Sequence, residues 1–290
     1  MKPHISAILT ASAALVLTIC FNAAALCADF TPDKDISVVS REDGSGTRGA
    51  FVELFAITVK TPAGGKKDMT TKEAVIANKT DVMMLNIAND PYAIGYISLG
   101  SLNSSIKALE IDGVKAAPEN VRDGSYPIVR PFVIATKGEP TGLANDFISF
   151  ILSGDGQKVV AGAYIPVKDD APPYAGGKRS GKITVAGSSS VAPVMEKLKE
   201  AYIARNSGAV IEIQMSDSTA GMSGAMNGTC DIGMSSRNLK DSEKAKLRET
   251  VIAHDGIAVI VNNANPLTNV SSGQVKSIFT GAVVKWSEVK

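Results

Sequence analysis

The sequence contains few of the side chains from which catalytic and metal sites are usually built. Its 290 residues include two histidines and three cysteines, and neither a Gly-x-Ser-x-Gly elbow nor a Gly-Lys-Ser/Thr phosphate loop occurs. His4 lies in the apolar N-terminal segment, so any Ser–His–Asp triad would depend on His254, which lies within a strand-like run. One histidine and at most two cysteines do not complete the usual zinc ligand set. The sequence therefore predicts a protein that is not an enzyme and that needs no metal or other cofactor.

Aromatic residues are few, and neither positive nor negative charges are in clear excess. Aromatic side chains make up 5% of the chain, and 30 lysines and arginines stand against 29 acidic residues. Nucleic-acid-binding domains usually carry a basic field, and single-strand binders also carry aromatic platforms for the bases. We therefore expect no nucleic-acid partner, and any anion that the chain binds must be held by local geometry.

The first 28 residues have the pattern of an export signal. Lys2 precedes an apolar run at 5–21, and small residues follow, so that cleavage after Ala25 or after Ala28 would satisfy the usual rule. An uncleaved anchor helix is the alternative, although the run is short for a membrane span. We expect a periplasmic protein exported by a cleavable signal peptide.

The cysteines indicate neither a lipid anchor nor a disulfide framework. Bulky residues, Ile19 and Leu26, precede Cys20 and Cys27 where lipid attachment requires a small one. Cys20 leaves with the signal and Cys27 leaves with it if cleavage follows residue 28, which strands Cys230. We expect Cys230 to be a packed thiol.

Two blocks of alternating strand and helix patterns flank a breaker-rich linker at 169–181, which contains two prolines and three glycines. Such alternation predicts α/β lobes in which helices cover largely parallel sheets. The predicted strands lie at 36–40, 93–98, 129–136, 183–186, 210–215, 231–234 and 251–262, and the predicted helices at 48–58, 143–152, 191–206 and 221–227.

Three strand-to-helix junctions, at 40–49, 186–193 and 216–221, are rich in glycine and hydroxyl side chains. A helix start exposes unpaired N–H groups, glycine allows close backbone approach, and serine or threonine adds a hydroxyl donor. In α/β sheets such loops converge beyond the carboxyl ends of the strands. One junction alone would be an ordinary N-cap, but three of them, with Arg41 beside the first, predict an anion site.

Two further patterns in the first junction have alternative interpretations. Gly44, Gly46 and Gly49 have the spacing of a dinucleotide fingerprint, but charged residues separate them from the strand, and 61–71 is loop-like where a second strand is expected. We therefore expect no nucleotide site. Arg41 and Asp43 are spaced to pair across the turn, which would aim the guanidinium at a ligand. The alternative is a surface ion pair that contributes little.

Several runs resemble the phosphate-binding components of bacterial phosphate ABC transporters: ISVVSREDGSGTRGAFVELF, ITVAGSSSVAPVMEKLKEAY, DIGMSSR, HDGIAVIVNNANP, IFTGAVVKWSEV and YPIVRPFVIATKGEPTGLANDFISFILSGDGQKVV. The resemblance covers nearly all of the chain after the signal, but the order differs. In the family the GSSSVAP block comes first and the IFTG…W run leads into the SREDGSGT block. The resemblance thus implies a circular permutation in which 169–181 joins the old chain ends.

The fold that the resemblance implies is an α/β, two-lobed periplasmic binding protein of type II, with the ligand in the cleft between the lobes. One lobe is expected to be split between 29–125 and 262–290, and the other to be continuous over 126–261. The permutation predicts that Ile36 and Val289 are spatial neighbours.

By matching motifs, the resemblance also implies a set of anion contacts and an orienting carboxylate, Asp43, for the arginine of that set. Some family members carry near Ser236 a carboxylate that accepts the proton of hydrogen phosphate, whereas this chain has Ser236-Arg237, and Asp217 and Asp255 are possible substitutes. The choice between phosphate and sulfate therefore stays open. The implied contacts are Arg41, Ser45, Gly46, Thr47, Ser189, Ser190, Ser218, Ser236 and Arg237.

The implied function is capture of inorganic phosphate for the membrane permease of an ABC importer by a monomeric receptor. Another tetrahedral oxyanion, such as sulfate or molybdate, is the alternative of the same class. From other classes, a secreted phosphate-ester hydrolase and an adhesion or signalling module with a vestigial cleft stay open.

Overall fold

A computed structural model describes residues 30–62 and 65–289, so the predicted signal peptide lies outside the described residues. Its main sheet has the strand order β11-β10-β12-β8-β13-β5-β1-β4, with β6 and β9 also pairing with β13. The strands of this sheet are β1 (Ser37–Arg41), β4 (Val75–Ala77), β5 (Ala93–Ser98), β6 (Lys107–Ala108), β8 (Val129–Thr136), β9 (Ile165–Pro166), β10 (Ser180–Ser188), β11 (Gly208–Ser216), β12 (Ile232–Ser235) and β13 (Arg248–Val261).

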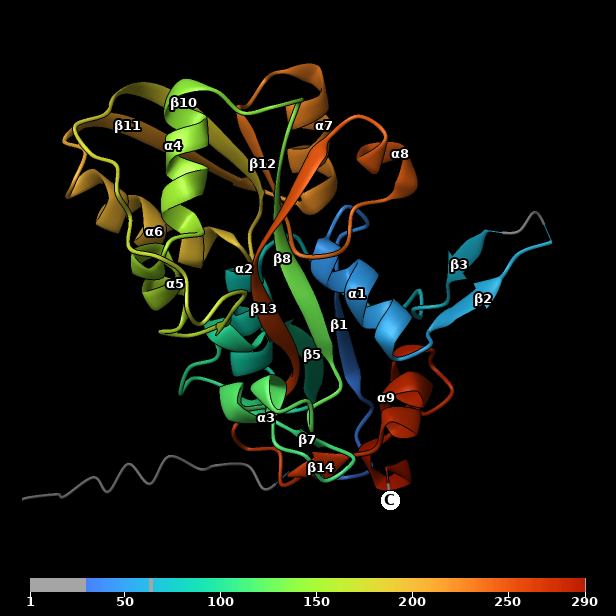
Figure 1. Cartoon of the computed structure of the whole chain (residues 1–290). Helices are drawn as coiled ribbons and strands as arrows, with labels where there is room; N and C mark the ends of the chain where they lie inside the picture. The colour runs from blue at the N-terminus through green and yellow to red at the C-terminus, as the bar shows by residue number, and fades with distance from the viewer. Residues whose placement is uncertain (1–29, 63–64, 290) are drawn as a thin grey trace, which may run out of the picture.

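Helices cover this sheet, and two small strand pairs lie apart from it (Figure 1). The pairs are β2 (Thr58–Lys60) with β3 (Lys66–Asp68), and β7 (Glu110–Ile111) with β14 (Asn269–Val270). The helices are α1 (Gly46–Leu54), α2 (Thr80–Asn89), α3 (Pro118–Arg122), α4 (Gly142–Ile151), α5 (Gly154–Val160), α6 (Ala192–Ile203), α7 (Ser218–Asn227), α8 (Asp241–Lys244) and α9 (Ser272–Phe279), with 3-10 turns η1 (Leu99–Ser101) and η2 (Trp286–Glu288).

The apolar side chains form separate cores at the two ends of the main sheet. One core takes its fully buried members from 38–128 and 257–286, and the other, with a smaller satellite cluster, takes them from 132–253. We call the parts around these cores lobe A and lobe B. Strand pairs β1–β4, β1–β5, β10–β11 and β10–β12 are parallel, and the α/β class is confirmed. The sheet is mixed and not largely parallel, because β13 pairs antiparallel with β5, β6, β8 and β9, and β12 pairs antiparallel with β8.

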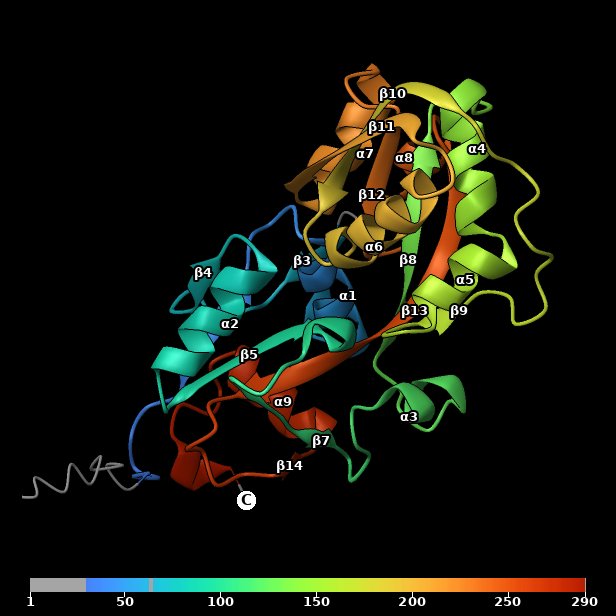
Figure 2. The same ribbon diagram turned by 90° about the vertical axis from the view of Figure 1, so that its left-hand side faces the viewer.

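Strands β8 and β13 connect the two lobes, and Figure 2 shows both running from one to the other. They pair antiparallel from Arg248↔Thr136 to Gly256↔Val129, with a register shift between Val251 and Ala253. Both strands are dominated by apolar residues, which suits strands buried on two faces. Because both strands are shared, any movement of one lobe against the other must be absorbed near this crossing.

Most predicted elements occur within a few residues of their expected bounds, and the strands at 93–98 and 129–136 match fully. Residues 167–179, which include most of the predicted linker, contain neither helix nor strand. The prediction of a loop at 61–71 is wrong, because β3 lies within this range and pairs with β2 in an exposed hairpin. Helix α2, which follows β4, was not predicted.

The two ends of the described chain lie side by side in lobe A. The Ile36 amide donates to the Val284 carbonyl at 2.8 Å, and the Ser287 amide donates to the Pro32 carbonyl at 2.7 Å. Ile36 and Val289 both pack against the core of lobe A, so they lie in the same lobe. The residues that the linker at 169–181 connects, in contrast, belong to lobe B.

This arrangement predicts that the chain ends can be moved. Joining residue 289 to residue 30 through a short glycine–serine linker, and opening the chain between 170 and 180, preserves both cores and every strand pairing. The closing loop is short, so we expect a melting temperature within about 5 °C of the parent protein, followed by circular dichroism. As a control, opening the chain inside β10 instead should prevent folding; equal behaviour of the two variants would contradict the prediction.

No helix in the described ranges combines the length and the apolar character that crossing a membrane requires.

Candidate functional site

The three glycine- and hydroxyl-rich junctions meet where lobe A faces lobe B. The junction before α1 comes from lobe A, and the junctions before α6 and α7 come from lobe B; in Figure 2, α1 and α2 lie below α6 and α7. Hydroxyl and guanidinium groups from these junctions and from the start of α2, β8 and the end of β12 are buried, and several of them are hydrogen-bonded across the seam. We call this set the polar cluster; it consists of Arg41, Thr47, Thr80, Arg130, Ser188, Ser189, Ser190, Ser218 and Ser236.

Arg41 lies at the end of β1 with its side chain almost fully buried, at 2% exposure. Its Nη2 donates to Ser189 Oγ of lobe B at 3.1 Å, and its Nη1 donates to Thr80 Oγ1 at 3.4 Å. The backbone below is fixed by Tyr96, whose hydroxyl accepts from the Arg41 amide at 3.2 Å; burial raises the pKa of Tyr96 to about 12. The guanidinium therefore enters the cluster from a rigid strand end.

The carboxylate that orients Arg41 is Glu42, which corrects the prediction of Asp43. Both Glu42 oxygens accept from Arg41, at 2.8 Å from Nε and 2.8 Å from Nη2. Asp43 is 96% exposed and pairs with Arg48 at 2.8 Å. A bidentate pair of this kind fixes the plane of the guanidinium, so that Nη1 and Nη2 face Thr80 and Ser189 at the seam.

Hydroxyl groups connect the lobes through the centre of the cluster. Thr47 Oγ1 and Ser190 Oγ are 2.8 Å apart, although they come from α1 and from the turn before α6. Thr80 Oγ1, at the start of α2, is 3.3 Å from Ser190 Oγ and 3.4 Å from Ser189 Oγ. Thr80 was not among the predicted anion contacts. The start of helix α2 gives no sequence signal, because its N-cap residue, Lys79, carries no capping hydroxyl or carboxylate.

The two glycines of the SREDGSGT loop, Gly44 and Gly46, lie directly against lobe B. A Cβ at Gly46 would lie 2.3 Å from Ser218 Oγ and 2.8 Å from Ser236 Oγ, and one at Gly44 would lie 2.3 Å from an Asp217 oxygen. The Gly44 carbonyl also accepts from the Thr219 amide at 3.2 Å. Glycine suits both positions because any side chain there would collide with the side chains that lobe B presents at the seam.

The remaining predicted hydroxyls take defined places. Ser45 caps α1 by accepting from the Arg48 amide. Ser218 is the first residue of α7, and its Oγ accepts from the Ser236 amide at 3.1 Å, while Ser236 Oγ accepts from Ser188 Oγ at 3.0 Å. Gly46 and Thr47 begin α1, so their amides have no partner within that helix. The cluster therefore combines helix-start amides, hydroxyls and guanidinium groups, all of which can donate to an anion.

Arg130, on β8, is a member of the polar cluster that was not among the predicted anion contacts. Its Nη1 donates to Thr47 Oγ1 at 2.6 Å, and its Nε and Nη2 donate to Asp255 Oδ2 at 3.1 and 3.0 Å. Burial lowers the pKa of Arg130 and raises that of Asp255, while the attraction between them opposes both shifts. The available signal was a charged residue within each of two mostly apolar strands, which favours a buried ion pair.

The two other acidic candidates are already engaged in the fold. Asp217 caps α7 by accepting from the Ala220 amide at 2.8 Å, and Asp255 accepts from Arg130 and from Ser98 Oγ. Glu42 is bonded to Arg41. Each carboxylate near the cluster thus serves a cap or a guanidinium.

The structure places Arg237 outside the cluster, which corrects its assignment as an anion contact. Its guanidinium donates to both Glu243 oxygens, at 2.8 and 2.9 Å, and to the Asn238 carbonyl at 2.9 Å. Glu243 is buried, so this pair fixes the turn after β12.

Replacing Arg237 by glutamine is therefore expected to lower stability and to leave anion affinity within about threefold. The cost is expected to be about 3–5 kcal/mol, because Glu243 would stay buried without its cation. Chemical denaturation measures the first quantity and calorimetric titration of the folded protein the second. A loss of affinity above about 30-fold would return Arg237 to the binding site.

Other reactive side chains lie elsewhere. Cys230 is a buried free thiol whose pKa is raised by burial, as expected of a packed cysteine. His254 lies exposed on β13. Within the described ranges, no group of three or more histidine, cysteine or acidic side chains could hold a metal ion.

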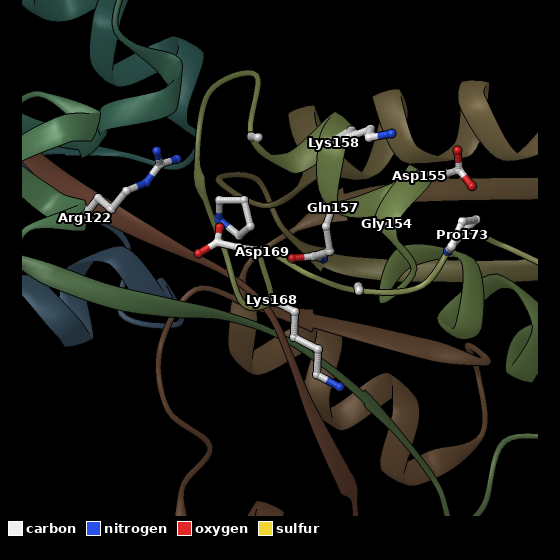
Figure 3. Close-up of a pocket in the computed structure, with 11 residues that line it drawn as sticks. Arg122, Gly154, Asp155, Gln157, Lys158, Lys168, Asp169 and Pro173 are labelled. Carbon is white, nitrogen blue, oxygen red and sulfur yellow. The ribbon is translucent and has the colours of Figure 1, made fainter.

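A hollow of about 230 Å³ between α5 and the linker is lined by Arg122, Lys158 and Lys168. Its cationic groups do not converge on one point as the donors of the polar cluster do. Figure 3 shows these three side chains pointing in different directions. The polar cluster is the candidate site because its donors converge.

Comparisons with known proteins show the family and the fold of the chain. The family model of the PBP superfamily domain matches residues 21–155 and 172–290. The phosphate-binding protein PstS 2 of Streptococcus agalactiae is 52% identical over 257 residues, which cover 88% of this chain and 87% of the relative. The phosphate-binding protein PstS of Bacillus subtilis is 39% identical over 140 residues, which cover 47% of this chain and 43% of the relative.

A solved structure matches at the level of the whole fold. The crystal structure of a phosphate-binding protein of a phosphate ABC transporter from Streptococcus pneumoniae superposes with a TM-score of 0.70 and 46% identity. The superposition covers 88% of this chain and 100% of the chain from Streptococcus pneumoniae. The chain belongs to the PstS family of phosphate-binding proteins of phosphate ABC transporters.

Proposed function

We propose that the polar cluster binds one inorganic phosphate ion, and that the protein delivers it to the membrane permease of an ABC importer. The observation that carries the proposal is the convergence of donors from two lobes around Arg41: Ser189 and Ser190 of lobe B lie within hydrogen-bond distance of Arg41, Thr47 and Thr80 of lobe A. Family membership supports the same ligand, since the relatives are phosphate-binding proteins.

The donor set is large enough for tight capture. A micromolar dissociation constant corresponds to about −8 kcal/mol. A hydrogen bond to a charged group contributes about 1.5–3 kcal/mol, so a few of them, acting together in a buried site, exceed the cost of removing water from the ion. Donors that lie on both lobes bind more strongly when the lobes are together, so phosphate shifts the population toward the closed form.

The protein is further proposed to be a two-lobed monomer that acts in the periplasm. The lobes are proposed to be a split one, 29–125 with 262–290, and a continuous one, 126–261. The change of core supports this division, but it lies between 128 and 132 and between 253 and 257, so Tyr126, Ile128 and the end of β13 from 257 to 261 pack in the core of lobe A. The protein acts as a monomer in the periplasm after cleavage of its signal peptide. It has no enzymatic activity, in keeping with relatives that are binding proteins.

The order of the blocks is proposed to be a circular permutation relative to the Bacillus subtilis protein. A collinear match between permuted chains can contain only one of the two exchanged blocks, and that match covers less than half of either chain. The streptococcal match spans 88% of this chain, which is expected if that relative has the same order. The adjacent ends in lobe A provide the geometry.

A broader tetrahedral-anion receptor is the second candidate. Because Glu42 and Asp255 are both bonded to arginines, the cluster presents few acceptors for the proton by which hydrogen phosphate differs from sulfate. Calorimetric titration with phosphate, sulfate and molybdate decides between the candidates. We expect phosphate binding at micromolar concentration or below; a clear preference for sulfate, or turnover of a chromogenic phosphomonoester, would overturn the proposal.

A further inference from the structure

Arg130 is held on one edge by the strand that pairs with its own. The register of β8 and β13 places Asp255 opposite Arg130, and Nε and Nη2 both donate to one Asp255 oxygen. The other Asp255 oxygen accepts from Ser98 Oγ at 2.9 Å. The guanidinium is 3% exposed and lies above the Phe132 ring, with 5.3 Å from Cζ to the ring centroid. Its plane is therefore fixed before any ligand arrives.

The opposite edge of the same guanidinium faces the seam between the lobes. Nη1 donates to Thr47 Oγ1 of lobe A at 2.6 Å and to the Ser236 carbonyl of lobe B at 3.2 Å. Thr47 and Ser236 are two of the predicted anion contacts, so the Nη1 amino group reaches the same volume as they do.

A continuous set of hydroxyls joins this guanidinium to that of Arg41. From Arg130 the contacts run through Thr47, Ser190 and Thr80 to Arg41 Nη1, with separations of 2.6, 2.8, 3.3 and 3.4 Å. Burial is the main cause of the lowered pKa of Arg130, and the positive charge of Arg41 lowers it further. Each guanidinium has one carboxylate partner, Glu42 or Asp255, and a doubly charged anion between the two guanidinium groups would be attracted by both of them.

We propose that Arg130 is a second guanidinium contact for the bound anion, and that Asp255 is its positioning residue. The inference rests on the proposed function and extends it: the site would match a tetrahedral dianion with two cations, one delivered by β1 and one by the shared strand β8. Because Arg130 also contacts both lobes near the strand crossing, binding at this residue would couple directly to closure.

The competing explanation is that the Arg130–Asp255 pair only stabilises the junction of β8 and β13. The two explanations differ in what a lysine does at position 130. Lysine keeps the positive charge but lacks the planar, two-point donor geometry of the guanidinium. A binding role therefore predicts that Arg130→Lys restores part of the anion affinity that Arg130→Gln loses. A purely structural role predicts that anion affinity does not depend on the charge at this position.

The test is calorimetric titration of inorganic phosphate into the unsubstituted protein, Arg130→Gln, Arg130→Lys and the control Arg237→Gln, with melting temperatures measured without ligand. We expect Arg130→Gln to weaken binding about 10- to 150-fold, the range of one charge-assisted hydrogen bond. Arg130→Lys should lose about 10-fold or less, and Arg237→Gln about threefold or less. Equal affinities in all four proteins would overturn the inference.

A second variant guards against misfolding, since Arg130→Gln leaves Asp255 buried without a cation. In the double variant Arg130→Met with Asp255→Asn neither charge remains, so the junction can pack while the anion contact is lost. Phosphate binding by this variant within about threefold of the unsubstituted protein would contradict the role of Arg130. Absence of binding by the unsubstituted protein would instead overturn the proposed function, which keeps the two failures distinct.

Discussion

Replacing Arg41 by glutamine is expected to weaken phosphate binding by at least about 100-fold, the largest single-site loss in this protein. The side chain is 2% exposed, is oriented by two hydrogen bonds to Glu42 and reaches Ser189 across the seam. A neutral amide would remove a buried positive charge from the site and would leave the negative charge of Glu42 beside the anion. Both changes act in the same direction, so the loss exceeds that of one ordinary hydrogen bond.

The experiment is calorimetric titration of phosphate, with Arg205→Gln as the matched control. Arg205 also forms a two-point pair with a carboxylate, Asp155, but lies on the surface of lobe B away from the cluster. Its loss should change affinity by less than about twofold, since exposed pairs contribute little. An Arg41→Gln protein that melts normally and still binds phosphate as tightly as the parent would show that the cluster is not the binding site.

Replacing Gly46 by alanine is expected to weaken phosphate binding about 30-fold or more without harming the individual lobes. The added methyl group would lie 2.3 Å from Ser218 Oγ and 2.8 Å from Ser236 Oγ, both on the opposite lobe. To avoid this contact the lobes must separate, or Ser218 must release the Ser236 amide. Either response removes donors of one lobe from the anion, whereas alanine itself suits the start of a helix.

Gly49→Ala is the internal control for this prediction. It lies in the same helix, α1, and its Cβ would meet only the Arg237 Cδ at 3.4 Å, an ordinary contact. We expect it to raise stability by up to about 1 kcal/mol, as alanine does for glycine inside a helix, and to leave affinity unchanged. Phosphate titration and chemical denaturation of both variants give the comparison. Equal affinities of Gly46→Ala and the parent would mean that the lobes need not approach this closely for binding.

The local parts of the site were predictable from the sequence. The glycine and hydroxyl pattern at each strand-to-helix junction depends on a few neighbouring residues, so Gly46, Thr47, Ser189, Ser190 and Ser218 were placed correctly at helix starts. The α/β class followed for the same reason, because strand and helix periodicities are local.

The parts that depend on distant pairing were not predictable. Arg130 and Asp255 are 125 residues apart in the chain, and only the register of β8 with β13 brings them together. Arg237 was assigned to the ligand from its motif, but the turn after β12 places it on Glu243 instead. Glu42 and Asp43 are neighbours in the sequence, and which of them meets Arg41 depends on how the chain leaves β1, a detail that spacing alone does not determine.

The central claim is that turns from both lobes enclose a single tetrahedral anion. A crystal structure of the protein grown with phosphate tests it most directly. We predict one phosphate within about 3 Å of the Arg41 guanidinium and of hydroxyls or amides from the turns before α1, α6 and α7. Phosphate bound by donors of one lobe alone, or at a position away from Arg41, would contradict the claim.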